Sequence, residues 1–215
     1  MNKHDAKTGA SARYPDYDVL DKWDTPSWND PTREAVGKRL RVRDEPRFLD
    51  PDRFRILQAL CDRIVPQPSS RANKVPVAGL VDRMLGETES VGYRRPNMPP
   101  LRDAWRHGLL ALNEEAKERF GTDFADLPAG RQDTVLGMMQ NGDVRSPAWG
   151  DLPAQAFFKH RVLHDVTAAY YSHPTSWNEI GFGGPASPRG YVRLEANRRD
   201  AWEAKENHEA ARHDR

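Results

Sequence analysis

The sequence has a single cysteine, Cys61, among its 215 residues. An internal disulfide, a zinc ribbon, a protein-held iron–sulfur cluster and a c-type haem site each need at least two thiols, so the sequence excludes all four. Because Cys61 falls on the apolar side of a predicted helix, we expect it to be a small buried hydrophobe with little reactivity.

The sequence also lacks an excess of charge of one sign and a long apolar run. Its 33 basic residues nearly balance 32 acidic ones, which argues against a general nucleic-acid binder. The longest nearly uncharged run, around 165–171, is far shorter than the roughly 20 apolar residues that a spanning helix needs, so we expect no membrane insertion. No secretory signal begins the sequence. We therefore expect a cytoplasmic protein, or a periplasmic one only if a signal-bearing partner exports it.

Three zones differ in composition. Residues 1–47 are polar and proline-punctuated, residues 48–192 hold nearly all the periodic apolar residues, and residues 193–215 are about half charged. We predict an all-α fold, with a single compact domain over 48–192, an extended N-terminal arm and a charged C-terminal helix or tail.

The central zone predicts about five core helices. Asp50 and Pro51 provide an N-cap and a proline at the first helical position. The apolar side chains that follow recur at helical spacing, at Phe54, Leu57, Cys61 and Ile64. Similar spacing predicts helices over 77–85, 101–120, 128–141 and 153–170, and a short one over 32–40 in the arm. No run alternates apolar and polar residues for long enough to predict a strand.

Two stretches favour contact with another surface. The polar arm carries large aromatic side chains that must be buried against either this domain or a partner. Residues 172–191 combine glycines, prolines and aromatic residues, and we predict a long loop without helix or strand. Such loops are usually functional, which favours an interaction loop over one that merely closes the core.

No catalytic motif is evident. The sequence has no nucleophile elbow, phosphate loop or dinucleotide fingerprint. His160 and His164 are four residues apart on a predicted helix and could bind one metal ion, with Asp165 and His173 nearby in sequence. Ordinary surface or packing histidines are the commoner explanation of such a pair.

Several segments resemble a known family. Residues Leu60 to Pro66 resemble the opening helix of the gluconate 2-dehydrogenase subunit 3 family, the small subunits of flavin-dependent sugar dehydrogenases, and residues Val77 to Leu85 resemble its next segment. Further similar segments follow in the family's order, at 108–113, 120–127, 131–132, 157–158, 170–171, 177–181 and 190–191. The resemblance covers roughly 48–192.

The resemblance implies a non-catalytic subunit that binds no cofactor. It implies that a large partner of the glucose–methanol–choline (GMC) oxidoreductase type holds FAD and the sugar site, and that a cytochrome c subunit can be a further partner. Many members begin with a twin-arginine export signal, whereas this sequence begins with the polar arm.

We therefore predict an accessory subunit that binds and stabilises a FAD-dependent oxidoreductase acting on a sugar or related alcohol. Two alternatives are a stand-alone metal-dependent enzyme that uses His160 and His164, and a homo-oligomeric structural protein. We expect no catalytic residue and assign eight residues to the partner interface: Trp23, Trp28, Trp177, Phe182, Gly184, Pro185, Gly190 and Tyr191.

Overall fold

The computed structural model describes residues 13–87, 97–188, 190 and 202–206. These residues form helices and no strand; an isolated antiparallel bridge joins Trp28 to Pro188. The predicted all-α class is confirmed. Contacts divide the chain into two compact units, which we call the helical unit (described residues of 43–67 and 76–170) and the terminal unit (described residues of 1–42, 68–75 and 171–215).

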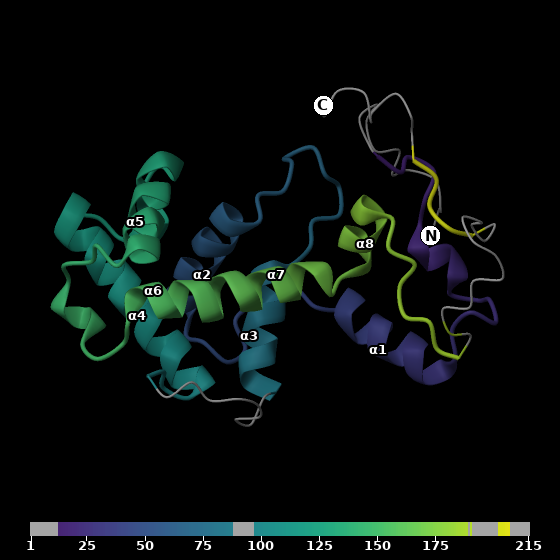
Figure 1. Ribbon diagram of the computed structural model, residues 1–215, viewed down its shortest axis with the longest axis horizontal. Coiled ribbons are helices and arrows are strands. Elements are labelled where there is room, and N and C mark those ends of the chain that lie inside the picture. Colours follow the sequence, from purple (N-terminus) through teal and green to yellow (C-terminus); the bar gives the residue numbers. More distant parts are fainter. Residues whose placement is uncertain (1–12, 88–96, 189, 191–201, 207–215) are drawn as a thin grey trace. The chain divides into compact units, whose positions relative to one another are not determined.

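The helical unit contains the five predicted core helices. The first four are α2 (Pro51–Ile64), α3 (Val77–Glu87), α4 (Leu101–Phe120) and α5 (Ala129–Asn141). The fifth is divided into α6 (Ala154–Phe157), a π-helical turn (Phe158–Val162) and α7 (Leu163–Tyr171), which follow one another along one rod in Figure 1. Short 3₁₀ turns cover Phe124–Asp126 and Pro147–Trp149.

A close approach between α4 and α6 lies at the centre of this unit. A Cβ atom on Gly108 would lie 2.2 Å from the Phe157 ring, so only glycine admits that ring. Trp105, one turn earlier on α4, meets the same ring edge-on at 5.5 Å. These three residues lie in a core in which Leu57 and Leu109 are also fully buried.

Two buried carboxylates hold loops of the helical unit. Asp82 on α3 accepts hydrogen bonds from three successive backbone N–H groups, those of residues 47, 48 and 49, at 2.7, 3.0 and 2.8 Å. Glu115 on α4 accepts from the N–H groups of Arg145 and Ser146 at 2.9 and 2.8 Å, and pairs with Arg119. Burial acts to raise the pKa of Glu115, but these donors outweigh it and hold the pKa below its ordinary value.

The terminal unit is assembled from segments that are far apart in the sequence. It contains a 3₁₀ turn (Val19–Lys22), α1 (Asp30–Leu40) and α8 (Pro174–Ile180). Its buried core consists of Val19, Trp28, Val36 and Trp177. This division differs from the predicted boundaries at 47 and 192, because Trp28 of the arm is buried together with Trp177, in the segment that follows α7.

The expectation that 172–191 has neither helix nor strand is wrong, because α8 lies within it. His173 caps this helix: its Nδ1 accepts a hydrogen bond from the Thr175 N–H at 3.3 Å. Pro174 occupies the first helical position and Gly181 ends the helix with φ +66°. Histidine is not among the usual N-caps, and seven residues are too few for a periodic signal.

The C-terminal helix or tail predicted after 192 falls largely on residues outside the described ones. The described part, 202–206, is not helical. In the portion of the chain that the structure describes, we find no helix of the length and apolarity required to cross a membrane.

Candidate interaction surface

The structure describes seven of the eight residues that we assigned to a partner interface, and Tyr191 lies outside the described residues. Trp28 and Trp177 are almost completely buried, at 1% and 3% exposure. Gly184 lies between them with φ +70°: a Cβ atom there would lie 3.1 Å from the Trp28 ring and 3.4 Å from the Trp177 ring. The remaining four are partly or fully exposed, namely Trp23, Phe182, Pro185 and Gly190. A role for these eight residues in an interface stays a prediction.

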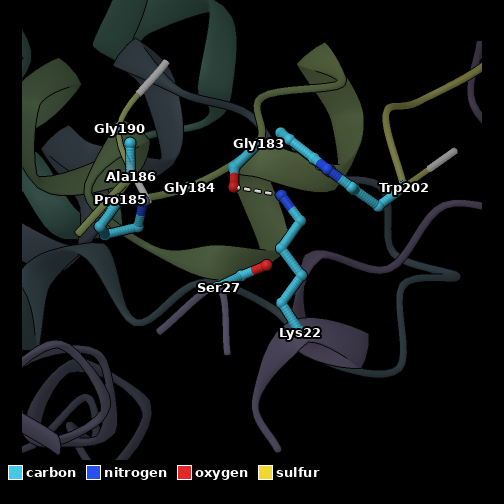
Figure 2. A pocket seen from close by; sticks show the side chains of 8 residues that line it. All are labelled: Lys22, Ser27, Gly183, Gly184, Pro185, Ala186, Gly190 and Trp202. Carbon is cyan, nitrogen blue, oxygen red and sulfur yellow. Dashed lines mark hydrogen bonds between the residues drawn. The ribbon is translucent and has the colours of Figure 1, made fainter. Parts of the chain in front are cut away.

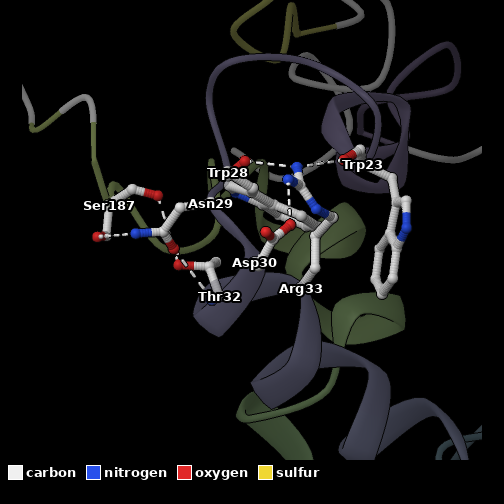
Figure 3. A network of polar contacts seen from close by, with 7 residues as sticks. All are labelled: Trp23, Trp28, Asn29, Asp30, Thr32, Arg33 and Ser187. Carbon is white, nitrogen blue, oxygen red and sulfur yellow. Dashed lines mark hydrogen bonds and ion pairs between the residues drawn. The ribbon is translucent and has the colours of Figure 1, made fainter.

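Trp28 is held by the segment that follows α8. Its Nε1 donates a hydrogen bond to the Pro185 carbonyl oxygen at 3.0 Å, and its ring lies edge-on to Trp23 with 5.9 Å between centroids. Arg33 donates to the carbonyl oxygens of both tryptophans, at 3.1 Å for Trp23 and 2.5 Å for Trp28, and also pairs with Asp30 (Figure 3). The Arg33 guanidinium thus binds the backbone of the arm at both tryptophans.

The start of α1 joins the same network. Asn29 caps the helix by accepting from the Thr32 N–H at 3.1 Å, and its amide donates to the Ser187 hydroxyl at 3.4 Å (Figure 3). Thr32 donates to the Ser187 carbonyl oxygen at 3.4 Å. These bonds tie residues 28–32 to the glycine- and proline-rich segment that follows α8.

Trp177 links α8 to the end of α7. Its Nε1 donates to the Tyr171 carbonyl oxygen at 2.6 Å, and its ring meets Phe182 edge-on at 5.7 Å. The Arg39 guanidinium lies 5.9 Å from the Trp177 ring centroid, at the limit of a cation–π contact. Trp177 therefore supports Phe182 and, at 3% exposure, offers almost no surface of its own to a partner.

Exposed apolar side chains lie at both ends of α8. Three large apolar side chains there are exposed: Tyr171 and Ile180 each at 49% and Phe182 at 39%. We call these three residues the α8 rim. Sequence reasoning found Phe182 but missed Tyr171 and Ile180, because α8, which lies between Tyr171 and Phe182, was not predicted. Elsewhere among the described residues, Leu110 and Leu163 of the helical unit are the other exposed large apolar side chains.

A small hollow of the terminal unit lies beside the glycine-rich segment. Lys22 extends along it, donates to the Gly183 carbonyl oxygen at 2.6 Å, and places its ammonium 3.5 Å from the Trp202 ring centroid (Figure 2). Ser27, residues 183–186 and Gly190 complete its lining. The hollow has space for about one water molecule, so it is too small to hold an organic ligand.

The two histidines considered as metal ligands lie in the helical unit. His164 is largely exposed and its Nδ1 donates to Asp165 at 2.9 Å, while the other Asp165 oxygen accepts from Trp105 Nε1 at 2.8 Å. Within the described ranges, no three side chains of His, Cys, Asp or Glu gather in a group able to hold a metal ion. The metal-dependent alternative therefore gains no support from the geometry.

Comparison with known proteins identifies one family. The model of a family described as gluconate 2-dehydrogenase subunit 3 matches residues 51–184. Neither a curated protein nor a solved structure matches the chain. The family's name denotes a subunit of gluconate 2-dehydrogenase, which implies an accessory role for its members. Because the match spans more than half of the sequence, the chain belongs to the gluconate 2-dehydrogenase subunit 3 family.

Proposed function

We propose that this chain is the non-catalytic small subunit of a FAD-dependent GMC-type oxidoreductase that acts on a sugar or related alcohol. In this role it binds and stabilises the large subunit, which holds the FAD, and a cytochrome c subunit is a further candidate partner. The observation that carries the proposal is the family match over residues 51–184.

The α8 rim is the surface that we assign to the large subunit. Stable interfaces have an apolar, aromatic-rich centre and bury on the order of 2,000 Å² or more in permanent complexes. Tyr171, Ile180 and Phe182 provide such side chains on one short segment. In this arrangement Trp28 and Trp177 support the rim from within the chain, while Trp23 and Phe182 are predicted interface residues with exposed surface.

Co-purification tests the proposed function directly. The tagged full chain is expressed together with the products of its neighbouring reading frames, and the affinity eluate is analysed for flavin absorbance and for a large co-eluting subunit. We expect a yellow complex whose large subunit loses solubility or flavin when this chain is left out. An eluate without a flavoprotein contradicts the proposal.

A matched pair of variants tests the assigned surface. Ile180→Glu places a charge on the rim, and Leu110→Glu places the same charge on a similarly exposed leucine of α4. We expect Ile180→Glu to weaken binding of the large subunit by at least about tenfold, while Leu110→Glu leaves it within about twofold of the original chain. The reverse order would move the interface to the helical unit and leave the proposed function standing.

A further inference from the structure

Residues 202–206, which we call the C-terminal strap, are attached to the terminal unit at three points. Trp202 lies over the Lys22 ammonium, 3.5 Å from ring centroid to Nζ. Ala204 is buried, with 6% of its surface exposed. Glu206 accepts from Arg13 Nε at 2.8 Å and from the Tyr14 hydroxyl at 3.4 Å. The strap therefore holds the N-terminal segment at both Arg13–Tyr14 and Lys22.

The strap also contacts the backbone where α8 ends. A Cβ atom on Gly183 would lie 2.9 Å from Trp202 Cζ3, and one on Gly181 would lie 3.0 Å from the Ala204 methyl carbon. The same Gly181 position would meet the Tyr14 ring at 2.7 Å. Because positions 181 and 183 are glycines, the side chains of Tyr14, Trp202 and Ala204 can pack directly against the backbone there.

We propose that the C-terminal strap is a latch that keeps the N-terminal segment docked on the terminal unit. Trp202 and Glu206 reach the arm directly, and the arm carries Trp28, which is buried together with Trp177. Exposed ion pairs and single cation–π contacts are individually weak. Release of the strap therefore loosens residues 13–28 locally, while the helical unit stays folded.

Hydrogen exchange of the full chain, read by mass spectrometry, tests the latch. We expect Trp202→Ala to raise exchange of peptides covering 13–28 by about threefold or more, and to leave peptides from α4 unchanged. Glu206→Gln removes the charge that pairs with Arg13 and has a smaller effect of the same pattern. Glu34→Gln is the control, because it neutralises an exposed carboxylate paired with Lys38 in α1, away from the strap contacts.

Gly183→Ala provides a second test that keeps every attached side chain. Its new methyl group would crowd the Trp202 ring and Lys22, and the backbone there is not in the left-handed region, so the displacement acts on the strap contact itself. Faster exchange of 13–28 in both variants supports the latch. Exchange of 13–28 at the original rate in Trp202→Ala, or loss of protection in α4 as well, overturns it. The test uses the chain without a partner, so its result is independent of the proposed function.

Discussion

The helical and terminal units reach buried cores by different routes. In the helical unit, α2 packs on α3, α4 and α5, and buried carboxylates such as Asp82 and Glu115 accept hydrogen bonds from the backbone of loops. The terminal unit joins segments more than 150 residues apart, as in the bond from Trp28 Nε1 to the Pro185 carbonyl oxygen. The core of the helical unit depends on side chains whose positions follow a local sequence pattern. The core of the terminal unit depends on aromatic rings that pack against the backbone of glycines from a distant part of the sequence.

The largest effect that we predict falls in the helical unit. Trp105→Ala removes a completely buried indole that packs on Phe157, so we expect the free energy of unfolding to fall by about 4 kcal/mol. Urea denaturation measures it. Trp105→Phe keeps much of the ring but removes the N–H that donates to Asp165, and should cost about 1–2 kcal/mol. Equal losses in the two variants would mean that the hydrogen bond, and not packing, dominates at this site.

The helices of the helical unit could be predicted because their signals are local. The cap at Asp50, the proline at 51 and the spacing of Phe54 and Leu57 all lie within two turns of the helix that they specify. The π turn at Phe158–Val162 could not be predicted, since it leaves the apolar pattern of the segment nearly unchanged. The buried carboxylates were also missed, because an acidic residue in a helix usually faces solvent.

The terminal unit could be predicted only in part. The aromatic composition of the arm correctly indicated that its rings need a surface, but composition cannot distinguish the chain's own core from a partner. The partner of Trp28 is Trp177, which is 149 positions away, and the fit requires Gly184 between them. Such long-range fit leaves no periodic signal in the sequence, so our candidate interface included residues that the structure shows to be buried.

The second prediction tests whether the terminal unit has an energetic core of its own. Trp177→Ala removes the ring that contacts Gly184 and Phe182, and we expect a loss of about 3 kcal/mol confined to this unit. The four-residue buried cluster is small, so it relaxes around the cavity more than the helical core does. Hydrogen exchange should accelerate in 19–40 and not in α4. Phe182→Ala, at a 39% exposed site, should cost about 1 kcal/mol or less; a larger cost than Trp177→Ala would contradict this ranking.

The third prediction uses pH to separate the two units. Burial, aided by the nearby positive charge of Arg39, lowers the pKa of His173 from 6.5 to about 4. Between those values the unfolded chain binds more protons than the folded one, so the stability of the terminal unit is complete above about pH 6.5 and falls as the pH decreases toward 4. A shift of that size corresponds to at most about 3.4 kcal/mol, and partial solvent screening reduces it to about 2 kcal/mol.

His173→Asn is the control for this pH dependence. Asparagine is a good N-cap whose side-chain oxygen can accept from the Thr175 N–H, as His173 Nδ1 does, but it does not titrate. Carboxylates elsewhere also weaken the fold in acid, so the informative quantity is the difference between the two chains in stability measured from pH 7 to pH 4. The original chain should lose more of the protection of α8 over this range than the variant does. Parallel losses would show that His173 titrates alike in the folded and unfolded chains, and would remove the cap as the source of acid sensitivity.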